Sequence, residues 1–312
     1  MTQRLPKLVA LLGPTASGKT DLALAFAKKF NGEIISADSR QVFKKMDIGT
    51  AKPKGEWEMV NGRKSYIVEG IPHYGMDIVD PGQAVSVADF KKLALEAARD
   101  IAARGKIPFL VGGTGLYIWA VVDNLDFPKI TPNKKLRRSL EKKSLSDLQA
   151  LLNTLDPTAA AVVDVKNPRR LMRALEVAIL SGESFVKQRR IGRPIFDALQ
   201  IGIAWNQSVL QQRWEHRVDE QMARGLVGET QALVKQRYSG NLPSMSSIGY
   251  KQIGSYLRGE CTLPEAIALI KIETRRYAKR QVTWFKRDKR IQWIAGDDIT
   301  VAEGLVKDFL IP

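Results

Sequence analysis

The order of apolar and polar positions along the chain predicts strands that alternate with helices. Apolar runs at 7–12, 33–37, 107–111 and 199–204 have the length and density of buried parallel strands. Amphipathic stretches with apolar positions three and four apart lie between them, and two of these begin at recognisable caps. Ser86 and Asp89 have the spacing of a capping box, and Asn167 followed by Pro168 is typical of a helix start. The pattern predicts an α/β fold, a parallel sheet flanked by helices.

The first apolar run ends at a glycine-rich loop that matches G-x-x-x-x-G-K-[ST] between a predicted strand and a predicted helix. The backbone N–H groups of such a loop converge on an anion at a helix N-terminus, where the helix dipole also favours negative charge. Lys19 is expected to contact terminal phosphate oxygens, and the Thr20 hydroxyl suits Mg²⁺. The motif leaves open which phosphate compound is bound. The residues of the predicted loop are Gly13, Pro14, Thr15, Ala16, Ser17, Gly18, Lys19 and Thr20.

Two further strand ends carry polar groups. Asp38 follows the run at 33–37, and Thr114 follows the run at 107–111 after two glycines. Both are expected near the loop, because the carboxyl ends of strands in open α/β sheets face the ligand crevice. Asp38 is a candidate metal ligand, general base or helix cap. A phosphate-loop NTPase normally places an Asp at such a strand end to hold Mg²⁺. The predicted strand at 107–111 is followed by Gly-Gly-Thr and not by such an Asp. The site is therefore suited to bind a diphosphate and is weakly equipped for ATP hydrolysis.

The charge of the chain is strongly positive and unevenly distributed. Its 49 Lys and Arg residues exceed its 33 Asp and Glu residues, which gives a net charge of +16. Residues 131–312 hold 31 of the basic and 19 of the acidic side chains, and residues 271–290 alone hold nine basic and two acidic ones. Such an excess favours a polyanionic partner, because each neutralised phosphate releases counterions. Tyr277, Trp284 and Phe285 lie in the same segment, where aromatic rings either stack on bases or pack a helix.

Two pairs of arginines have helical spacing. Arg169 and Arg173 are four residues apart in the helix that begins at Asn167, so both can reach neighbouring phosphates of one partner. Arg213 and Arg217 are also four apart and can bind a diphosphate through bidentate hydrogen bonds. Arg217 is the preferred candidate for the arginine that binds the diphosphate, and Arg213 is the second candidate. Salt bridges to Glu215 or Asp219 are the alternative for the second pair.

Other classes of protein are excluded or disfavoured. The single cysteine, Cys261, permits no internal disulfide, and with only His73 and His216 beside it the chain lacks the ligands of a Cys/His zinc site. No stretch approaches the roughly 20 apolar residues of a membrane span. We therefore expect a soluble, cytoplasmic protein without a membrane association.

Seven motifs occur in an order that resembles the tRNA dimethylallyltransferase (tRNA isopentenyltransferase) family. They are GPTASGKT at 13–20, ADSRQ at 37–41, MDIGTAKP at 46–53, GGTGLY at 112–117, NPRRLMRALE at 167–176, SIGYKQ at 247–252 and RRYAKRQVTWFKRD at 275–288. The resemblance covers essentially the whole chain. The C-terminal zinc finger of eukaryotic members is not among its motifs, so a bacterial-type member is expected.

The resemblance implies a P-loop NTPase-like fold, in which a first part of the core (1–125) and the remainder of the core with basic C-terminal helices (198–312) enclose a mostly helical, tRNA-binding insertion (126–197). It implies transfer of a dimethylallyl group from dimethylallyl diphosphate to the N6 amine of the adenosine immediately 3′ of the anticodon. We further expect Mg²⁺ as cofactor, from the loop motif, and a monomeric protein. The catalytic residues are then Asp38 as general base, Arg217 and Thr114, and the partner is the anticodon stem-loop. The residues expected to bind tRNA are Asp38, Ser39, Arg40, Gln41, Thr114, Asn167, Pro168, Arg169, Arg170, Leu171, Arg173, Gly249, Tyr250, Lys251 and Gln252.

Three alternatives remain at the level of sequence. An adenylate isopentenyltransferase would share the loop and the chemistry but modify free AMP, ADP or ATP, and it would need neither the basic insertion nor the basic C-terminal segment. A small-molecule kinase would use ATP in the same loop but would lack the usual Mg²⁺-holding Asp. An RNA-binding protein with a relict loop would have no reason to keep Gly13, Gly18, Lys19 and Thr20 together.

Overall fold

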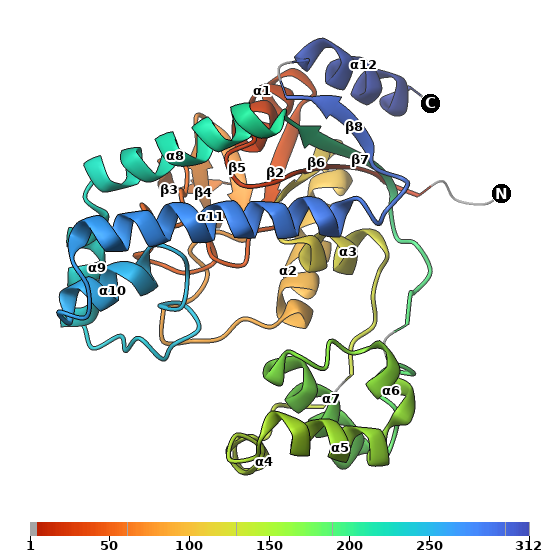
Figure 1. The fold of residues 1–312 in the computed structure, drawn as a ribbon. Coiled ribbons are helices and arrows are strands. Elements are labelled where there is room, and N and C mark those ends of the chain that lie inside the picture. Colours follow the sequence, from red (N-terminus) through yellow and green to blue (C-terminus); the bar gives the residue numbers. More distant parts are fainter. Residues whose placement is uncertain (1–4, 61, 129, 189, 297, 312) are drawn as a thin grey trace. The chain divides into compact units, whose positions relative to one another are not determined.

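The computed structural model describes residues 5–60, 62–128, 130–188, 190–296 and 298–311, and the chain forms two compact units. Unit 1 comprises Met1–Val122 and Ile195–Pro312, and unit 2 comprises Asp123–Pro194. Unit 2 is thus inserted into the chain of unit 1, and Figure 1 traces the helices and strands of each unit.

Unit 1 is built on one mostly parallel sheet. In the described residues its strand order is β3-β4-β5-β2-β6-β1-β7-β8. The strands from β5 to β8 in that order pair in parallel, and β3 and β4 form an antiparallel hairpin that pairs with β5. The strands span Lys7–Leu12 (β1), Gly32–Ser36 (β2), Glu56–Val60 (β3), Arg63–Val68 (β4), Ile71–Tyr74 (β5), Ile107–Gly112 (β6), Asp197–Ala204 (β7) and Gln292–Ala295 (β8).

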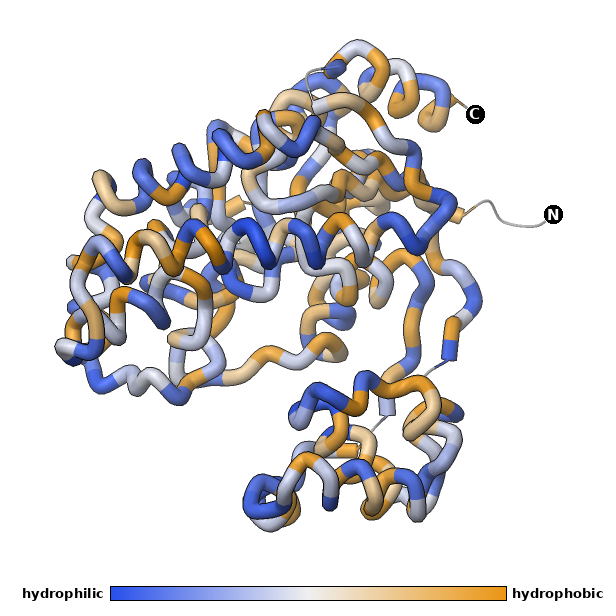
Figure 2. Tube along the Cα trace, viewed as in Figure 1, coloured by the Kyte–Doolittle hydropathy of each residue, from blue (hydrophilic) through white to orange (hydrophobic). Residues whose placement is uncertain are grey.

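The four predicted apolar runs form β1, β2, β6 and β7, which are mostly buried because helices cover both faces of the sheet. The side chains of β1 alternate between the two faces: Val9 and Leu11 enter one apolar core, and Leu8, Ala10 and Leu12 enter the other. The hydropathy trace shows the same apolar concentration within the sheet (Figure 2).

Sequence analysis did not predict β3, β4, β5 and β8. The hairpin strand β3 reads EWEMV and is largely exposed at the edge of the sheet, so it lacks the continuous apolar run of a central strand. β5 and β8 have only four residues each, too few for a periodic signal.

The helices of unit 1 pack on both faces of the sheet. One core lies between the sheet and α1 and α12, and the other lies between the opposite face and α2 and α3. A third core joins α8, α9, α10 and α11 with the segment that follows β2. The helices span Lys19–Lys29 (α1), Val87–Ala103 (α2), Gly115–Val122 (α3), Gln207–Ala223 (α8), Leu226–Lys235 (α9), Tyr250–Leu257 (α10), Leu263–Phe285 (α11) and Ile299–Leu310 (α12). The predicted capping box at Ser86 is present at the start of α2.

The described residues of unit 2 form helices and one isolated β-bridge between Leu125 and Ile191, and the unit has its own core, built from leucines and alanines of α5, α6 and α7 together with Leu140. Its helices span Lys134–Leu140 (α4), Leu145–Leu155 (α5), Pro157–Val162 (α6) and Pro168–Ser181 (α7). Asn167 caps α7 as predicted, since its side chain accepts the backbone N–H groups of Arg169 and Arg170. Among the helices described here, none has the length and apolar content needed to cross a bilayer.

Candidate functional site

The phosphate loop lies between β1 and α1, as the motif predicted. Gly18 has a φ of +89°, a conformation open to glycine at no steric cost, and it precedes the first residue of α1. Lys19 folds back over the loop, and its Nζ donates to the carbonyl of Pro14 at 2.6 Å. Burial, followed by the nearby charge of Arg217, lowers the pKa of Lys19 to about 7, although Asp38 acts in the opposite direction. The loop therefore presents a buried cationic centre with too little negative charge around it, which an anion would correct.

Asp38 and Thr114 lie beside the loop at the ends of β2 and β6, where parallel neighbouring strands bring them together. Asp38 Oδ1 accepts the backbone N–H of Arg40 at 2.8 Å, which holds the carboxylate in a tight turn. Thr114 Oγ1 accepts the backbone N–H of Ser39 at 3.1 Å, so the threonine holds the same turn from the β6 side. The structure thus places Thr114 as a support for the segment that carries Asp38.

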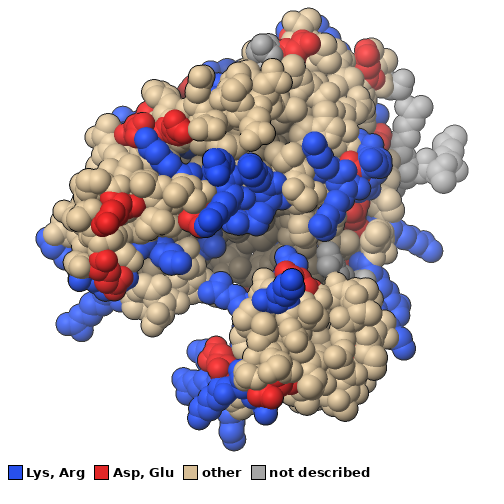
Figure 3. Space-filling model, viewed as in Figure 1, with Lys and Arg blue, Asp and Glu red and all other residues tan. Residues whose placement is uncertain are grey.

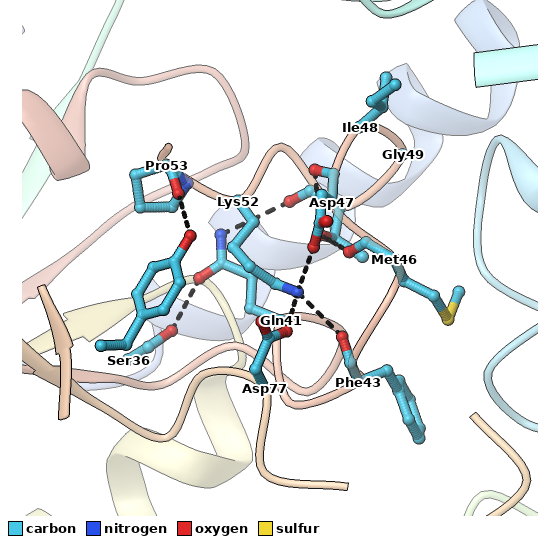
Figure 4. Close-up of polar contacts among 12 residues, drawn as sticks. Ser36, Gln41, Phe43, Met46, Asp47, Ile48, Gly49, Lys52, Pro53 and Asp77 are labelled. Atoms are coloured by element: carbon cyan, nitrogen blue, oxygen red, sulfur yellow. Dashed lines mark hydrogen bonds and ion pairs between the residues drawn. The ribbon is translucent and has the colours of Figure 1, made fainter. Parts of the chain in front are cut away.

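The segment 46–53 forms one wall of the site through a buried polar cluster (Figure 4). Lys52, whose side chain is 1% exposed, donates to the carbonyl of Phe43 at 2.9 Å and pairs with Asp47 at 2.6 Å and with Asp77. Gln41 accepts the Ser36 hydroxyl at 2.8 Å. A buried lysine is stable when charged only if it is paired, so these carboxylates fix the wall in one conformation.

Helix α8 carries the predicted arginine pair against the loop. Arg217 NH1 lies 3.4 Å from Thr15 Oγ1, and burial lowers its pKa from the usual value. Arg213 donates instead through Nε to the carbonyl of Ala16 at 2.7 Å, and its guanidinium lies 4.7 Å above the ring of Trp205. Neither arginine is held by the alternative acidic partners, because Glu215 accepts from Gln211 and Asp219 pairs with Lys271.

Three adjoining cavities run through the site. The first, about 390 Å³, is lined by the loop residues 16–20 together with Lys54 and Arg224. The second, about 80 Å³, contains Lys19, Thr20 and Asp38. The third, about 580 Å³, shares Asp38 with the second. Arg217 and Ala51 line all three cavities, so the cavities adjoin one another, and Asp38 lies where the second meets the third.

Arg213 belongs to a different cavity, of about 280 Å³, which it lines with Trp205, Ser17 and Ile203. Arg217 therefore lines the cavities of the phosphate loop that hold Lys19 and Thr20, and Arg213 does not; that Arg217 binds the diphosphate stays a prediction.

The predicted tRNA-binding residues of unit 1 separate into those that line the cavities of the site and those that shape or support its walls. Ser39, Arg40, Lys251 and Gln252 line the 580 Å³ cavity, and Gln41 lines the 80 Å³ cavity. Gly249, with a φ of +92°, shapes the start of α10, and its N–H donates to Gln252 Oε1.

The assignment of Tyr250 to tRNA binding is wrong for its side chain. Tyr250 is fully buried, its hydroxyl donates to Glu229 Oε1, and it accepts the N–H of Gly49 at 3.1 Å. It supports the wall formed by residues 46–53 and is not available to a macromolecule in this conformation.

The predicted residues of unit 2 also differ in exposure. Pro168, Arg169 and Arg170 are exposed in the first turn of α7. The assignment of Leu171 is wrong, because its side chain is fully buried in the core of the unit. Arg173 donates to the buried carboxylate of Glu176 at 2.7 Å and to the carbonyl of Ile130 at 3.1 Å, so it is held within the fold rather than presented beside Arg169.

Sequence reasoning missed three side chains of α11 and α8 in the site. Tyr277 lines two of the cavities beside Asp38, and burial raises its pKa to about 12, so it remains a hydrogen-bond donor at neutral pH. Gln281, one helical turn further along, accepts the N–H of Thr15 at 2.9 Å and donates to the carbonyl of Gly113 at 2.8 Å. Gln221 of α8 donates to the carbonyls of Ile48 and Gly49. Tyr277 and Gln281 are four residues apart in the sequence, a spacing that puts both on one face of a helix and could have indicated this pair.

The fold and the site together define a phosphate-loop enzyme with a P-loop NTPase-like core, a cationic anion-binding loop and a carboxylate shared by two adjoining cavities. The sequence model of the family described as IPP transferase matches residues 41–288. A relative from Acetivibrio thermocellus named tRNA dimethylallyltransferase is 40% identical over 311 residues, which cover 97% of this chain and 96% of the relative. Another of that name from Carboxydothermus hydrogenoformans is 43% identical, with 92% of this chain and 91% of the relative covered. The chain belongs to the tRNA dimethylallyltransferase family.

Solved structures agree with this assignment. The full-length tRNA isopentenylpyrophosphate transferase of Bacillus halodurans is 38% identical, with a TM-score of 0.69 and coverage of 97% of this chain and 94% of that one. A eukaryotic dimethylallyltransferase described as acting on tRNA is 28% identical, with a TM-score of 0.77 and coverage of 97% and 77%. The chain is thus an enzyme of the prenyltransferase class, and the alternatives of a kinase and of a non-catalytic RNA-binding protein fall away.

Proposed function

We propose that this enzyme transfers a dimethylallyl group from dimethylallyl diphosphate to the N6 amine of the adenosine immediately 3′ of the anticodon in tRNA and releases diphosphate. The family supports this reaction, and one observation of the site carries it: the small cavity that contains Lys19 and Thr20 of the phosphate loop and the larger cavity of about 580 Å³ share Asp38 in their lining. Two substrates that enter from opposite ends would therefore meet at a carboxylate.

The acceptor end suits a base taken out of an RNA strand. The 580 Å³ cavity is within the range of small-ligand sites, and its lining includes Arg40, Lys251 and Arg280. Chemistry on a base requires that the base leave its stack, and basic side chains around the opening would hold the flanking phosphates.

Asp38 is the proposed general base. The N6 amine is a weak nucleophile because its lone pair delocalises into the ring. As the nitrogen forms its bond to C1 of the dimethylallyl group, the bond from C1 to the diphosphate oxygen breaks and its electron pair leaves with the diphosphate. The nitrogen then loses a proton, and Asp38 is placed to accept it. A positioned base contributes about 10²–10⁴-fold to such a reaction.

The loop end stabilises the leaving diphosphate. Lys19, Arg217 and the loop N–H groups surround the position where its negative charge develops. The hydroxyl of Thr20 lines the same cavities, and one protein oxygen together with diphosphate oxygens is a donor set that Mg²⁺ accepts. We include Mg²⁺ in the proposal, with Thr20 as its protein ligand; when bound, it supplies positive charge to the leaving group. We further propose that the enzyme is a cytoplasmic monomer. Sedimentation of the free protein tests its oligomeric state.

One incubation tests the function. The protein is given labelled dimethylallyl diphosphate and Mg²⁺ with unmodified tRNA, AMP or ATP as acceptor. Label in tRNA, located at the adenosine 3′ of the anticodon by nuclease mapping, is the expected result. Label in free nucleotide would identify an adenylate isopentenyltransferase, and ATP turnover without label in any acceptor would disprove the assignment of the loop to a prenyl diphosphate.

A further inference from the structure

The backbone carbonyls of the phosphate loop carry a set of contacts that the loop motif does not explain. Three consecutive carbonyls of the loop each accept a hydrogen bond from a side chain 188 to 199 residues further along the chain. One donor, Trp205, directly follows β7, and the other two lie in α8. The pairs are Trp214 Nε1 to Thr15 O at 3.1 Å, Arg213 Nε to Ala16 O at 2.7 Å and Trp205 Nε1 to Ser17 O at 3.0 Å. No part of the glycine-rich sequence itself requires these donors.

Peptide geometry gives these contacts a consequence for anion binding. A trans peptide is planar, so the carbonyl of one residue and the N–H of the next point in opposite directions. A donor that fixes the carbonyls of Thr15 and Ser17 on the outside of the loop also fixes the N–H groups of Ala16 and Gly18 on the other side. The donor to the Ala16 carbonyl likewise fixes the Ser17 N–H, which donates to the carbonyl of Pro14 at 3.3 Å within the loop. N–H groups of this kind are what a phosphate loop offers to its ligand.

The loop conformation needs support from outside. Ala16 has a φ of +62°, a left-handed conformation that costs an L-residue about 1–2 kcal/mol. Such a conformation persists when its surroundings determine it. The surroundings here are rigid, because Trp214 is 3% exposed and packs with Ala16 and Leu210 in one apolar cluster that Trp205 borders. Arg213 is held in turn against the Trp205 ring.

A fourth contact acts on the same loop from the opposite helix. Gln281 of α11 accepts the N–H of Thr15 and donates to the carbonyl of Gly113. The Thr15 residue is thus bonded at its N–H by α11 and at its carbonyl by α8, so the loop is fixed between two helices of the C-terminal half.

We propose that Trp205, Arg213 and Trp214 are positioning residues that hold the phosphate loop in its anion-binding conformation before the diphosphate arrives. The proposal rests on the proposed function, in which this loop binds the donor's diphosphate. Arg213 acts through the loop, whereas Arg217 faces the diphosphate. A preformed loop binds more tightly because less ordering accompanies binding, and its N–H groups are already directed at the charge that develops on the leaving group.

The experiment is the substitution Trp214→Phe, which keeps an aromatic ring in the cluster and removes one N–H donor. The matched control is Trp119→Phe, because the buried Trp119 Nε1 has no hydrogen-bond partner among the described residues. Isothermal titration with inorganic pyrophosphate and Mg²⁺ should show roughly tenfold weaker binding for W214F, as expected when a buried carbonyl loses its donor, and wild-type binding for W119F. In steady-state assays the KM for dimethylallyl diphosphate should rise, while the tRNA affinity of W214F remains that of the wild type.

Three results would overturn the proposal. The first is pyrophosphate binding by W214F as tight as that of W119F, and the second is no pyrophosphate binding by the wild-type protein. The third is a parallel loss of pyrophosphate and tRNA affinity with a lower Tm, which would indicate general disruption. Trp205→Phe, at a half-buried site whose indole bonds the carbonyl two residues further along the loop, provides the same test if W214F does not fold. Because pyrophosphate binding needs no acceptor, failure of the prenylation assay and failure of the positioning proposal are distinguishable.

Discussion

At the scale of single residues, Asp38 holds a backbone turn and is also the proposed general base. Its Oδ1 accepts the N–H of Arg40, and its carboxylate lines the two cavities that meet at the centre of the site. Substitution by asparagine separates these roles, because the amide oxygen still accepts the N–H but cannot take a proton at neutral pH.

We therefore expect Asp38→Asn to lower kcat by about 10²–10⁴-fold while leaving the Kd values of tRNA and of pyrophosphate nearly unchanged. Single-turnover prenylation and separate binding titrations measure the two quantities. A loss of tRNA affinity as large as the loss of kcat would show that Asp38 binds the acceptor rather than activating it.

A second residue-scale prediction concerns stability and pH. Glu33 is fully buried; burial alone would raise its pKa, but hydrogen bonds from Arg104, Lys106 and Tyr74 outweigh it and lower the pKa to about 2. Because the folded pKa lies below the ordinary 4.5, the carboxylate stabilises the fold above pH 4.5, and this stabilisation is lost as the pH falls from 4.5 to 2. The shift corresponds to about 3 kcal/mol.

Chemical denaturation of wild type and Glu33→Gln at several pH values measures this effect. The difference in unfolding free energy should be largest near neutral pH and should shrink below pH 4.5. Glu69→Gln serves as the control, since Glu69 forms an exposed pair with Lys28 and should show a small difference at every pH. A Glu33→Gln difference that stays constant down to pH 2 would contradict the assignment.

At the scale of elements, α7 shows how a helix divides its residues between two tasks. Its cap and its first turn present Arg169 and Arg170 to solvent, while Leu171 and Leu175 enter the core of unit 2. The same helix therefore supports the insertion and carries its exposed basic end.

We expect Leu171→Ala to destabilise unit 2 by about 2–5 kcal/mol, because it leaves a cavity in a small core. Ile179→Ala, on the same helix but 42% exposed, should cost less than about 1 kcal/mol. Hydrogen exchange resolved by segment measures both. Pyrophosphate binding should be unchanged in each variant, since the loop belongs to unit 1; weakened binding in Leu171→Ala would show that the loop depends on the insertion.

At the scale of the whole molecule, the distribution of charge is the dominant feature. Figure 3 shows Lys and Arg side chains gathered over α11, and the net charge of the chain is +16. A surface of this kind binds RNA mainly through phosphates, so the affinity should fall steeply with salt concentration.

The plot of log Kd for tRNA against log salt should therefore be steep, and Arg169→Ala should reduce its slope by about one phosphate contact, or roughly 0.7–0.9. Lys28 lies on α1 and forms an exposed pair with Glu69, and Lys28→Ala should leave the slope unchanged. Filter binding over a range of KCl concentrations measures these slopes. Equal slopes for Arg169→Ala and the wild type would remove α7's first turn from the RNA interface.

The sequence by itself determined the elements whose signals are local. The phosphate loop needs glycines at fixed spacing, α7 needs Asn167 and Pro168 at its start, and the central strands need unbroken apolar runs because both of their faces are covered. The order of seven motifs was equally available, and it identified the family and hence the reaction. The edge strand β3 was not predicted because a largely exposed strand lacks such a run.

Only the tertiary structure decided what each polar side chain does, because hydrogen bonds and burial depend on partners distant in sequence. Arg213 and Arg217 lie one turn apart on α8 and carry the same charge. Arg213 nevertheless bonds a loop carbonyl, whereas Arg217 lines the cavities of the site. Tyr250 lies in a polar motif but is buried against Glu229, and Gln281 lies in a basic segment but joins the phosphate loop to the end of β6. Local sequence fixes which groups are present, and the packing of α8 and α11 against the sheet fixes which of them meet.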